Sequence, residues 1–199
     1  MKAIIRCSLF CVILFFICGI IYPAVTTGVS QLVFPRQANG SMINANGKVI
    51  GSELIGQSFA DERYFQGRVS AVNYNIYSAD TKITLDMAKS GSDNLAPSNP
   101  KLKERIEKDI DEFLKKNPTV QKTKIPLSLF NQSFSGLDPD ITIVAAEIQI
   151  SRIADKTGID KAKLEQIIKN NTKGRLLGIF GEESVNVLNM NLEIQKLIK

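Results

Sequence analysis

The chain has 199 residues and a formal net charge of +5, which is spread along it without a run of like charges. This length suits one domain plus a short extra segment, and nucleic-acid binding is not expected because it requires a concentrated basic face. The sequence contains no histidine, which excludes His-dependent nucleophilic triads and the usual proton shuttle near neutral pH. The three cysteines, Cys7, Cys11 and Cys18, lie in the apolar N-terminal stretch, so none remains for a disulfide framework or a Cys-rich zinc site in the rest of the chain.

A stretch without charged residues runs from Cys7 to Pro35. As a helix, residues 7–25 would span about 28 Å, close to the ~30 Å hydrocarbon thickness of a bilayer. We therefore predict a transmembrane anchor over residues 7–27. A cleaved signal peptide and a lipoprotein are the alternatives, but the run leads into residues 22–26 without a small-x-small cleavage pair, and Cys18 follows Phe15-Phe16-Ile17 rather than a small residue.

The charges around this anchor predict its orientation. The amino terminus, Lys2 and Arg6 precede the span, whereas only Arg36 follows it closely. The positive-inside rule then places residues 1–6 in the cytoplasm and residues 28–199 in one domain on the extracytoplasmic side.

The next part of the chain predicts a hairpin, a long loop and a helix. Residues 41–45 and 48–52 flank Asn46-Gly47, two residues that tolerate positive φ, as a two-residue β-hairpin requires. A loop rich in Gly, Ser, Asn and Pro is expected over residues 90–100. Asn99 then caps a helix that begins at Pro100, shows apolar side chains on one face and ends at Asn117-Pro118.

The C-terminal part predicts further helices and a short strand. Its expected elements are a helix over residues 142–157 with Gly158 beyond its end, a helix capped by Asp160, a strand at Val185 and Val187, and a helix over residues 190–198. Because helices and strands do not alternate regularly, we predict an α+β fold: a single N-terminal transmembrane helix followed by a domain with a small β-sheet and several helices.

One short motif resembles a catalytic one. Asp155-Lys156-Thr157-Gly158 is similar to the phosphorylation sequence of P-type ATPases, where the Asp follows a buried strand. Here the Asp lies near the end of an amphipathic helix and another helix follows at once, so we interpret the four residues as a helix C-terminus. Neither a phosphate-binding loop nor the Thr-Val-Gly-Tyr-Gly filter of potassium channels occurs in the sequence.

Several separated stretches combine Gly, Ser, Asn and Pro, whose side chains form hydrogen bonds but are poor acids, bases or nucleophiles. Their order resembles the C subunit of Kdp-type potassium-transporting ATPases, and the resemblance covers the whole chain. The stretches that carry it are residues 51–59, 64–71, 90–100 and 135–139, and Leu177-Gly178, Gly181-Glu182 and residues 185–192.

The sequence departs from the pattern of that family at several positions. Val69 and Ala96 stand where the family usually has Pro and Gly, and Asp93 and Asp140 add carboxylates to two loops. These changes affect the details of any loop contact.

The resemblance implies a non-catalytic accessory subunit of an ATP-driven, high-affinity potassium import complex in the bacterial plasma (inner) membrane. Its implied partners are a channel-like potassium-binding subunit, a P-type ATPase subunit, a small stabilising subunit and the lipid bilayer. The family is described as a catalytic chaperone that raises the ATP affinity of the ATPase subunit, so ATP acts indirectly and potassium is the transported ion. No catalytic or metal-binding residue is expected, and the candidates for partner contacts are Gln57, Arg68, Ser92, Asn94, Leu95, Pro97, Ser98, Asn99, Gly136, Asp138, Glu182 and Asn186.

Two other classes of function remain open. A membrane-tethered envelope hydrolase would need a Ser–Lys pair or paired carboxylates, and the sequence shows no such constellation. A membrane-tethered envelope binding module would carry the same anchor and domain but would be isolated without a pump.

Overall fold

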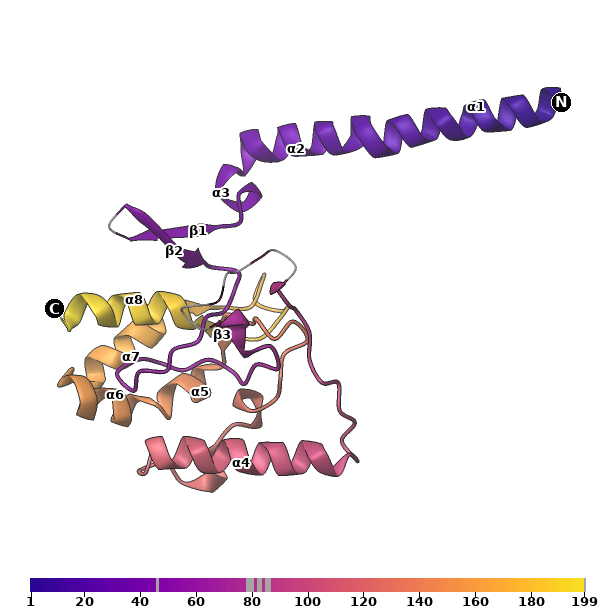
Figure 1. Ribbon diagram of the computed structural model, residues 1–199. Coiled ribbons are helices and arrows are strands. Elements are labelled where there is room, and N and C mark those ends of the chain that lie inside the picture. The colour runs from indigo at the N-terminus through magenta and orange to yellow at the C-terminus, as the bar shows by residue number, and fades with distance from the viewer. Residues whose placement is uncertain (46, 78–80, 82–83, 85–86, 199) are drawn as a thin grey trace. The chain divides into compact units, whose positions relative to one another are not determined.

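The computed structural model describes residues 1–198 except 46, 78–80, 82–83 and 85–86. The chain forms two compact units, residues 1–52 and residues 53–199. Figure 1 shows the α+β composition that the sequence predicts, with one long N-terminal helix and short strands among several helices. The predicted boundaries at residues 6 and 27 stay a prediction.

The first unit begins with a continuous helical stretch, Lys2–Val33, made of α1 (Lys2–Phe16), a π-helical turn (Ile17–Ile21) and α2 (Tyr22–Val33). Among the described residues it is the one helix whose length and composition suit a membrane span, and none of its side chains is buried in the protein. Pro23 has no N–H, so the carbonyl of Gly19 four residues earlier lacks an α-helical partner. The π turn lies there, with the Tyr22 N–H bonded to the Ile17 carbonyl.

The predicted hairpin is confirmed. After the short helix α3 (Pro35–Ala38), β1 (Met42–Ala45) pairs antiparallel with β2 (Lys48–Ser52), and Ala45 faces Lys48 across a two-residue turn. Gly47 has φ +75°, as the turn requires, while Asn46 lies outside the described residues.

The second unit contains a three-stranded antiparallel sheet in which β5 (Ser184–Asn186) lies between β3 (Asp140–Ile141) and β4 (Thr172–Lys173). Val185 of β5 faces Ile141 on one side and Thr172 on the other. Helix α7 (Lys161–Asn170) packs against α5 (Ile143–Glu147), α6 (Ile150–Thr157) and α8 (Val187–Leu197), and Figure 1 shows α7 between α6 and α8. The largest fully buried apolar side chains are Phe65, Ile153, Leu164, Ile167, Val185, Met190 and Ile194.

Helices α4 (Pro100–Lys116) and α7 begin, and α6 ends, at the capping residues that the sequence predicts. Helix α4 begins where Asn99 Oδ1 accepts a hydrogen bond from the Lys101 N–H at 3.0 Å, and α7 begins where Asp160 Oδ1 accepts from the Ala162 N–H at 2.9 Å. Helix α6 ends at Thr157 with Gly158 at φ +73°. The interpretation of Asp155-Lys156-Thr157-Gly158 as a helix C-terminus is therefore confirmed.

Two predicted elements are wrong in detail. The helix expected over residues 142–157 is divided into α5 and α6, because the Gln149 side chain donates to the Ala145 carbonyl at 3.0 Å and the Gln149 N–H bonds instead to Ala146, three residues back. Val187 is not in the strand but begins α8, three residues earlier than predicted, because Asn186 Oδ1 accepts from the Asn189 N–H at 3.0 Å and caps the helix.

Candidate functional site

The segment that carries Arg68 belongs to no helix or strand and is held by two buried side-chain amides. Asn191 accepts from the Phe65 N–H at 2.8 Å and donates to the Phe65 carbonyl at 2.9 Å. Gln149 pairs in the same way with the two backbone groups of Gln66, at 2.8 and 3.1 Å. Each amide thus satisfies both backbone groups of one residue, as a paired strand would do in a sheet. These bonds attach the backbone that leads to Arg68 to the core.

A buried guanidinium reinforces this arrangement. Arg152, which is 4% exposed, donates to Gln149 Oε1 at 2.8 Å, to Asn117 Oδ1 at 2.9 Å and to the Glu62 carbonyl. Burial lowers the pKa of Arg152 to about 10, so the group remains charged at neutral pH. Because the charge is buried and is satisfied by three neutral oxygens, removing any one of these partners would lower the stability of the fold.

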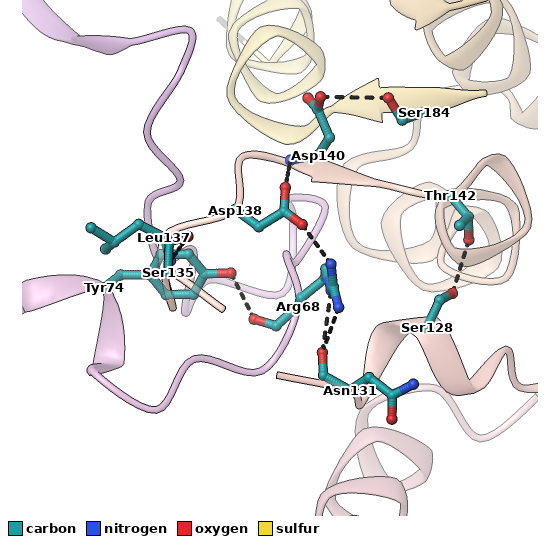
Figure 2. Close-up of polar contacts among 10 residues, drawn as sticks. All are labelled: Arg68, Tyr74, Ser128, Asn131, Ser135, Leu137, Asp138, Asp140, Thr142 and Ser184. Carbon is teal, nitrogen blue, oxygen red and sulfur yellow. Dashed lines mark hydrogen bonds and ion pairs between the residues drawn. The ribbon is translucent and has the colours of Figure 1, made fainter. Parts of the chain in front are cut away.

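Arg68 joins three loops of the candidate site. Its Nη1 lies 2.5 Å from Asp138 Oδ2, and its Nε and Nη2 donate to the Asn131 carbonyl at 3.2 and 2.9 Å. The two charged side chains are 24% and 27% exposed, so the pair is only partly screened by water. Figure 2 shows this guanidinium between the loops of Asn131 and Asp138.

Tyr74 holds the loop that carries Arg68 through two hydrogen bonds. Its phenol donates to the Arg68 carbonyl at 2.6 Å (Figure 2), and its backbone N–H donates to Ser70 Oγ at 3.0 Å. A Cβ at Gly56 would lie 2.7 Å from the Tyr74 ring and one at Gly67 would lie 2.8 Å from its hydroxyl, so only glycine leaves room for it. Burial, with a smaller contribution from Asp138, raises the pKa of Tyr74 to about 12.

Gly136 allows two other loops to meet here. It has φ +66°, and a Cβ at this position would lie 2.7 Å from the Gly91 carbonyl oxygen and 2.8 Å from Val72. Ser70 Oγ donates to the Gly136 carbonyl at 2.6 Å, and the Gly91 N–H donates to the Ser135 carbonyl at 2.8 Å. The loops around residues 70, 91 and 136 are therefore locked together by backbone-directed contacts.

The loops that carry Arg68, Asn131 and Asp138 border a cleft of about 390 Å³, which we call the polar cleft. Asp140 accepts a hydrogen bond from Asn186 at 3.1 Å and has Ser184 and Lys173 within 3.4 Å. Ser184 thus neighbours a carboxylate that is itself paired with an ammonium. The residues that line the polar cleft are Arg68, Ser128, Leu129, Asn131, Asp138, Asp140, Ile141, Thr142, Ala145, Glu182, Glu183 and Ser184.

The structure brings some of the predicted site residues together. Arg68, Asp138 and Glu182 line the polar cleft, Gly136 is buried in the adjoining turn, and Asn186 reaches the cleft through Asp140. That these residues contact partners stays a prediction.

The other predicted site residues lie outside the polar cleft. Three of them line a second cavity of about 520 Å³ that shares Asn131 with the cleft; they are Ser92, Asn94 and Leu95. Pro97 and Ser98 are exposed, Gln57 is half-buried, and Asn99 caps α4.

The two added carboxylates have partners within the chain. Asp93 pairs with the Gln132 side chain, which donates to Asp93 Oδ2 at 3.0 Å. Asp140 bonds to Asn186 and lies 3.4 Å from Lys173. The change at Val69 is compatible with the local backbone, since the Val69 N–H donates to the Leu129 carbonyl at 3.2 Å, a bond that Pro could not make.

The residues that hold the site in place were not among the predicted ones. Gln149 and Arg152 share one face of the helical stretch with Ala145, and a polar pair on an apolar face could have indicated a buried network. Asn191 lies on the buried face of α8 in the same way. Tyr74 carried no such signal, because its hydrogen bonds to Arg68 and Ser70 lie within an irregular loop that has no hydrophobic periodicity.

Known proteins resemble this chain over nearly its whole length. The family model described as the K+-transporting ATPase c chain, KdpC, matches residues 4–196. A "Potassium-transporting ATPase KdpC subunit" of Clostridium kluyveri is 50% identical over 98% of this chain and 94% of its own length. Proteins of the same description from Clostridioides difficile and Bacillus cereus are 47% and 50% identical, over 100% and 92% of this chain and 99% and 90% of their own lengths. The chain therefore belongs to the KdpC family, the c chains of K+-transporting ATPases.

Proposed function

We propose that this chain is a non-catalytic accessory subunit of an ATP-driven potassium import complex and that it works by docking rather than by covalent chemistry. The observation that carries the proposal is the family match over nearly the whole chain. The apolar helix Lys2–Val33 supports a single-pass anchor in a bacterial plasma membrane. The positive charges of the amino terminus, Lys2 and Arg6 before the span support an N-terminus in the cytoplasm and residues 28–199 outside.

The geometry of the polar cleft supports docking. The Arg68 guanidinium is already paired with Asp138 and with the Asn131 carbonyl, so its position is fixed before any partner arrives. Lys173 pairs with Asp140 and Glu53 rather than acting on the Ser184 hydroxyl, which neighbours the Asp140 carboxylate. A preorganised polar surface of this kind costs little ordering entropy on binding.

The proposed partners are a channel-like potassium-binding subunit, a P-type ATPase subunit and a small stabilising subunit of one complex. ATP is bound by the ATPase subunit and potassium is the ion transported. A domain outside the membrane does not touch cytoplasmic ATP, so we propose that the chain raises the ATP affinity of the complex by favouring one conformation of the transport subunits. Such an effect is a coupling free energy between distant sites and requires no contact with the nucleotide.

Steady-state ATPase measurements test this proposal. The complex is purified with the wild-type chain, without the chain, with Arg68→Gln and with the control Arg63→Gln, whose guanidinium pairs with Asp61 outside the polar cleft. We expect the KM for ATP to rise when the chain is absent, to rise in part with Arg68→Gln, and to keep the wild-type value with Arg63→Gln. An equal KM with and without the chain would remove the chaperone role, and a chain that purifies alone would support an envelope binding module instead.

A further inference from the structure

A short hairpin outside the polar cleft presents apolar side chains to solvent. Residues 175–181, which we call the apolar hairpin, connect β4 to β5. The Leu176 N–H donates to the Phe180 carbonyl at 2.8 Å and the Phe180 N–H donates to the Leu176 carbonyl at 3.0 Å. Leu177 and Gly178 take φ +55° and +75° in the turn. The backbone of the hairpin is therefore fixed by its own hydrogen bonds.

The apolar side chains of this hairpin are not covered by the described residues of the second unit. Leu176, Leu177, Ile179 and Phe180 are between 62% and 80% exposed. Four large apolar side chains on one ordered turn form the kind of exposed patch that marks an interaction site, since burying them is favourable and nothing in the described part of the second unit does so.

The charges beside the hairpin favour a protein over a lipid surface as its partner. Glu182 and Glu183 follow it directly and are exposed, while Arg175 is the one cation within it. Anionic lipid headgroups would repel the two carboxylates, and the hairpin carries neither Trp nor Tyr, the residues enriched at membrane interfaces. A protein recess with an apolar floor and a basic rim would match both features.

The hairpin also continues into the candidate site. Glu182, Glu183 and Ser184 line the polar cleft, so a partner that receives the hairpin would extend over the same face as Arg68 and Asp138. The apolar turn would supply the buried centre of that interface and the cleft its polar rim, which is the usual anatomy of protein interfaces.

We propose that the apolar hairpin inserts into an apolar, basic-rimmed recess on another subunit of the same potassium-transporting complex and anchors the second unit there. This inference rests on the proposed function. Leu177 and Phe180 are the central anchors, and Glu182 and Glu183 pair with cations at the rim of the recess.

Co-purification of the full-length chain with its pump tests the inference. The variants are Leu177→Asn, Phe180→Ser and their combination, and the control is Leu127→Ser, a side chain that is 61% exposed outside the hairpin. The altered side chains are exposed, so we expect unchanged melting temperatures. The dissociation constant of the double variant for the solubilised pump should be at least about tenfold higher than that of wild type. Leu127→Ser should leave the dissociation constant unchanged.

Fluorescence distinguishes a protein partner from the membrane. The chain has no Trp, so Ile179→Trp places one reporter in the hairpin of the chain alone, reconstituted in a lipid nanodisc. We expect no quenching by brominated lipids. Quenching, or hairpin variants that hold the pump as firmly as Leu127→Ser does, would overturn the inference, whereas a wild-type chain that never binds the pump would overturn the proposed function itself.

Discussion

Replacing Gln149 by methionine tests the buried amide network most sharply. The change keeps the length of the side chain but removes hydrogen bonds to the Gln66 N–H, the Gln66 carbonyl, the Ala145 carbonyl and the Arg152 guanidinium. Each buried group left without a partner costs about 1–3 kcal/mol, and Gln66 is only partly buried, so water replaces some of these bonds. We therefore expect Gln149→Met to lower the free energy of unfolding by about 3–4 kcal/mol.

Urea unfolding of the full-length chain in detergent, followed by circular dichroism and tyrosine fluorescence, measures this loss. Gln121→Met is the matched control, because Gln121 is exposed and should change stability by less than about 0.5 kcal/mol. If the two variants differ by less than about 1 kcal/mol, the amide network does not hold the Arg68 segment and the reasoning fails.

Three further predictions concern single residues. Gly136→Ala should lower the free energy of unfolding by about 2–5 kcal/mol in the same urea assay. Gly158→Ala, at a similar φ but in open space, should lower it by only about 1–2 kcal/mol. Equal losses would refute the steric argument. The phenol of Tyr74 should ionise near pH 12, and the tyrosinate absorbance that Tyr74→Phe removes reports this ionisation. Because the pKa of Tyr74 is raised from 10.0 in the folded chain, Tyr74 contributes stability below pH 10 that is lost as the pH rises to about 12. Ionisation of Tyr74 near pH 10 would contradict its burial. Glu104→Cys should react with a membrane-impermeant maleimide added outside intact cells, since Glu104 is exposed and is not among the predicted partner contacts; labelling only after lysis would reverse the proposed orientation.

The sequence predicted those elements whose signals are local. Asn99 and Asp160 are side-chain caps that act on backbone groups two residues away, and Gly158 ends a helix through its own φ. The hairpin of residues 42–52 likewise depends on Gly47, whose φ of +75° lies in the turn. Such features can be predicted because the residues that cause them are neighbours along the chain.

The errors and omissions come from contacts between distant residues. The break between α5 and α6 depends on Gln149, whose side chain is directed by Gln66, 83 positions away. Arg68 and Asp138 were predicted only as separate candidates, and their ion pair depends on the turn at Gly136 and on the packing of Tyr74. Periodicity does not contain such information, because tertiary packing decides it.

The most direct test of the whole account is the composition of the complex that contains this chain. Membranes that express the chain with the other pump subunits are solubilised in mild detergent, and the chain is isolated through a tag and analysed by native mass spectrometry. We predict one assembly that contains the chain together with the P-type ATPase subunit and the potassium-binding subunit. Recovery of the chain without either subunit would contradict its role in potassium transport.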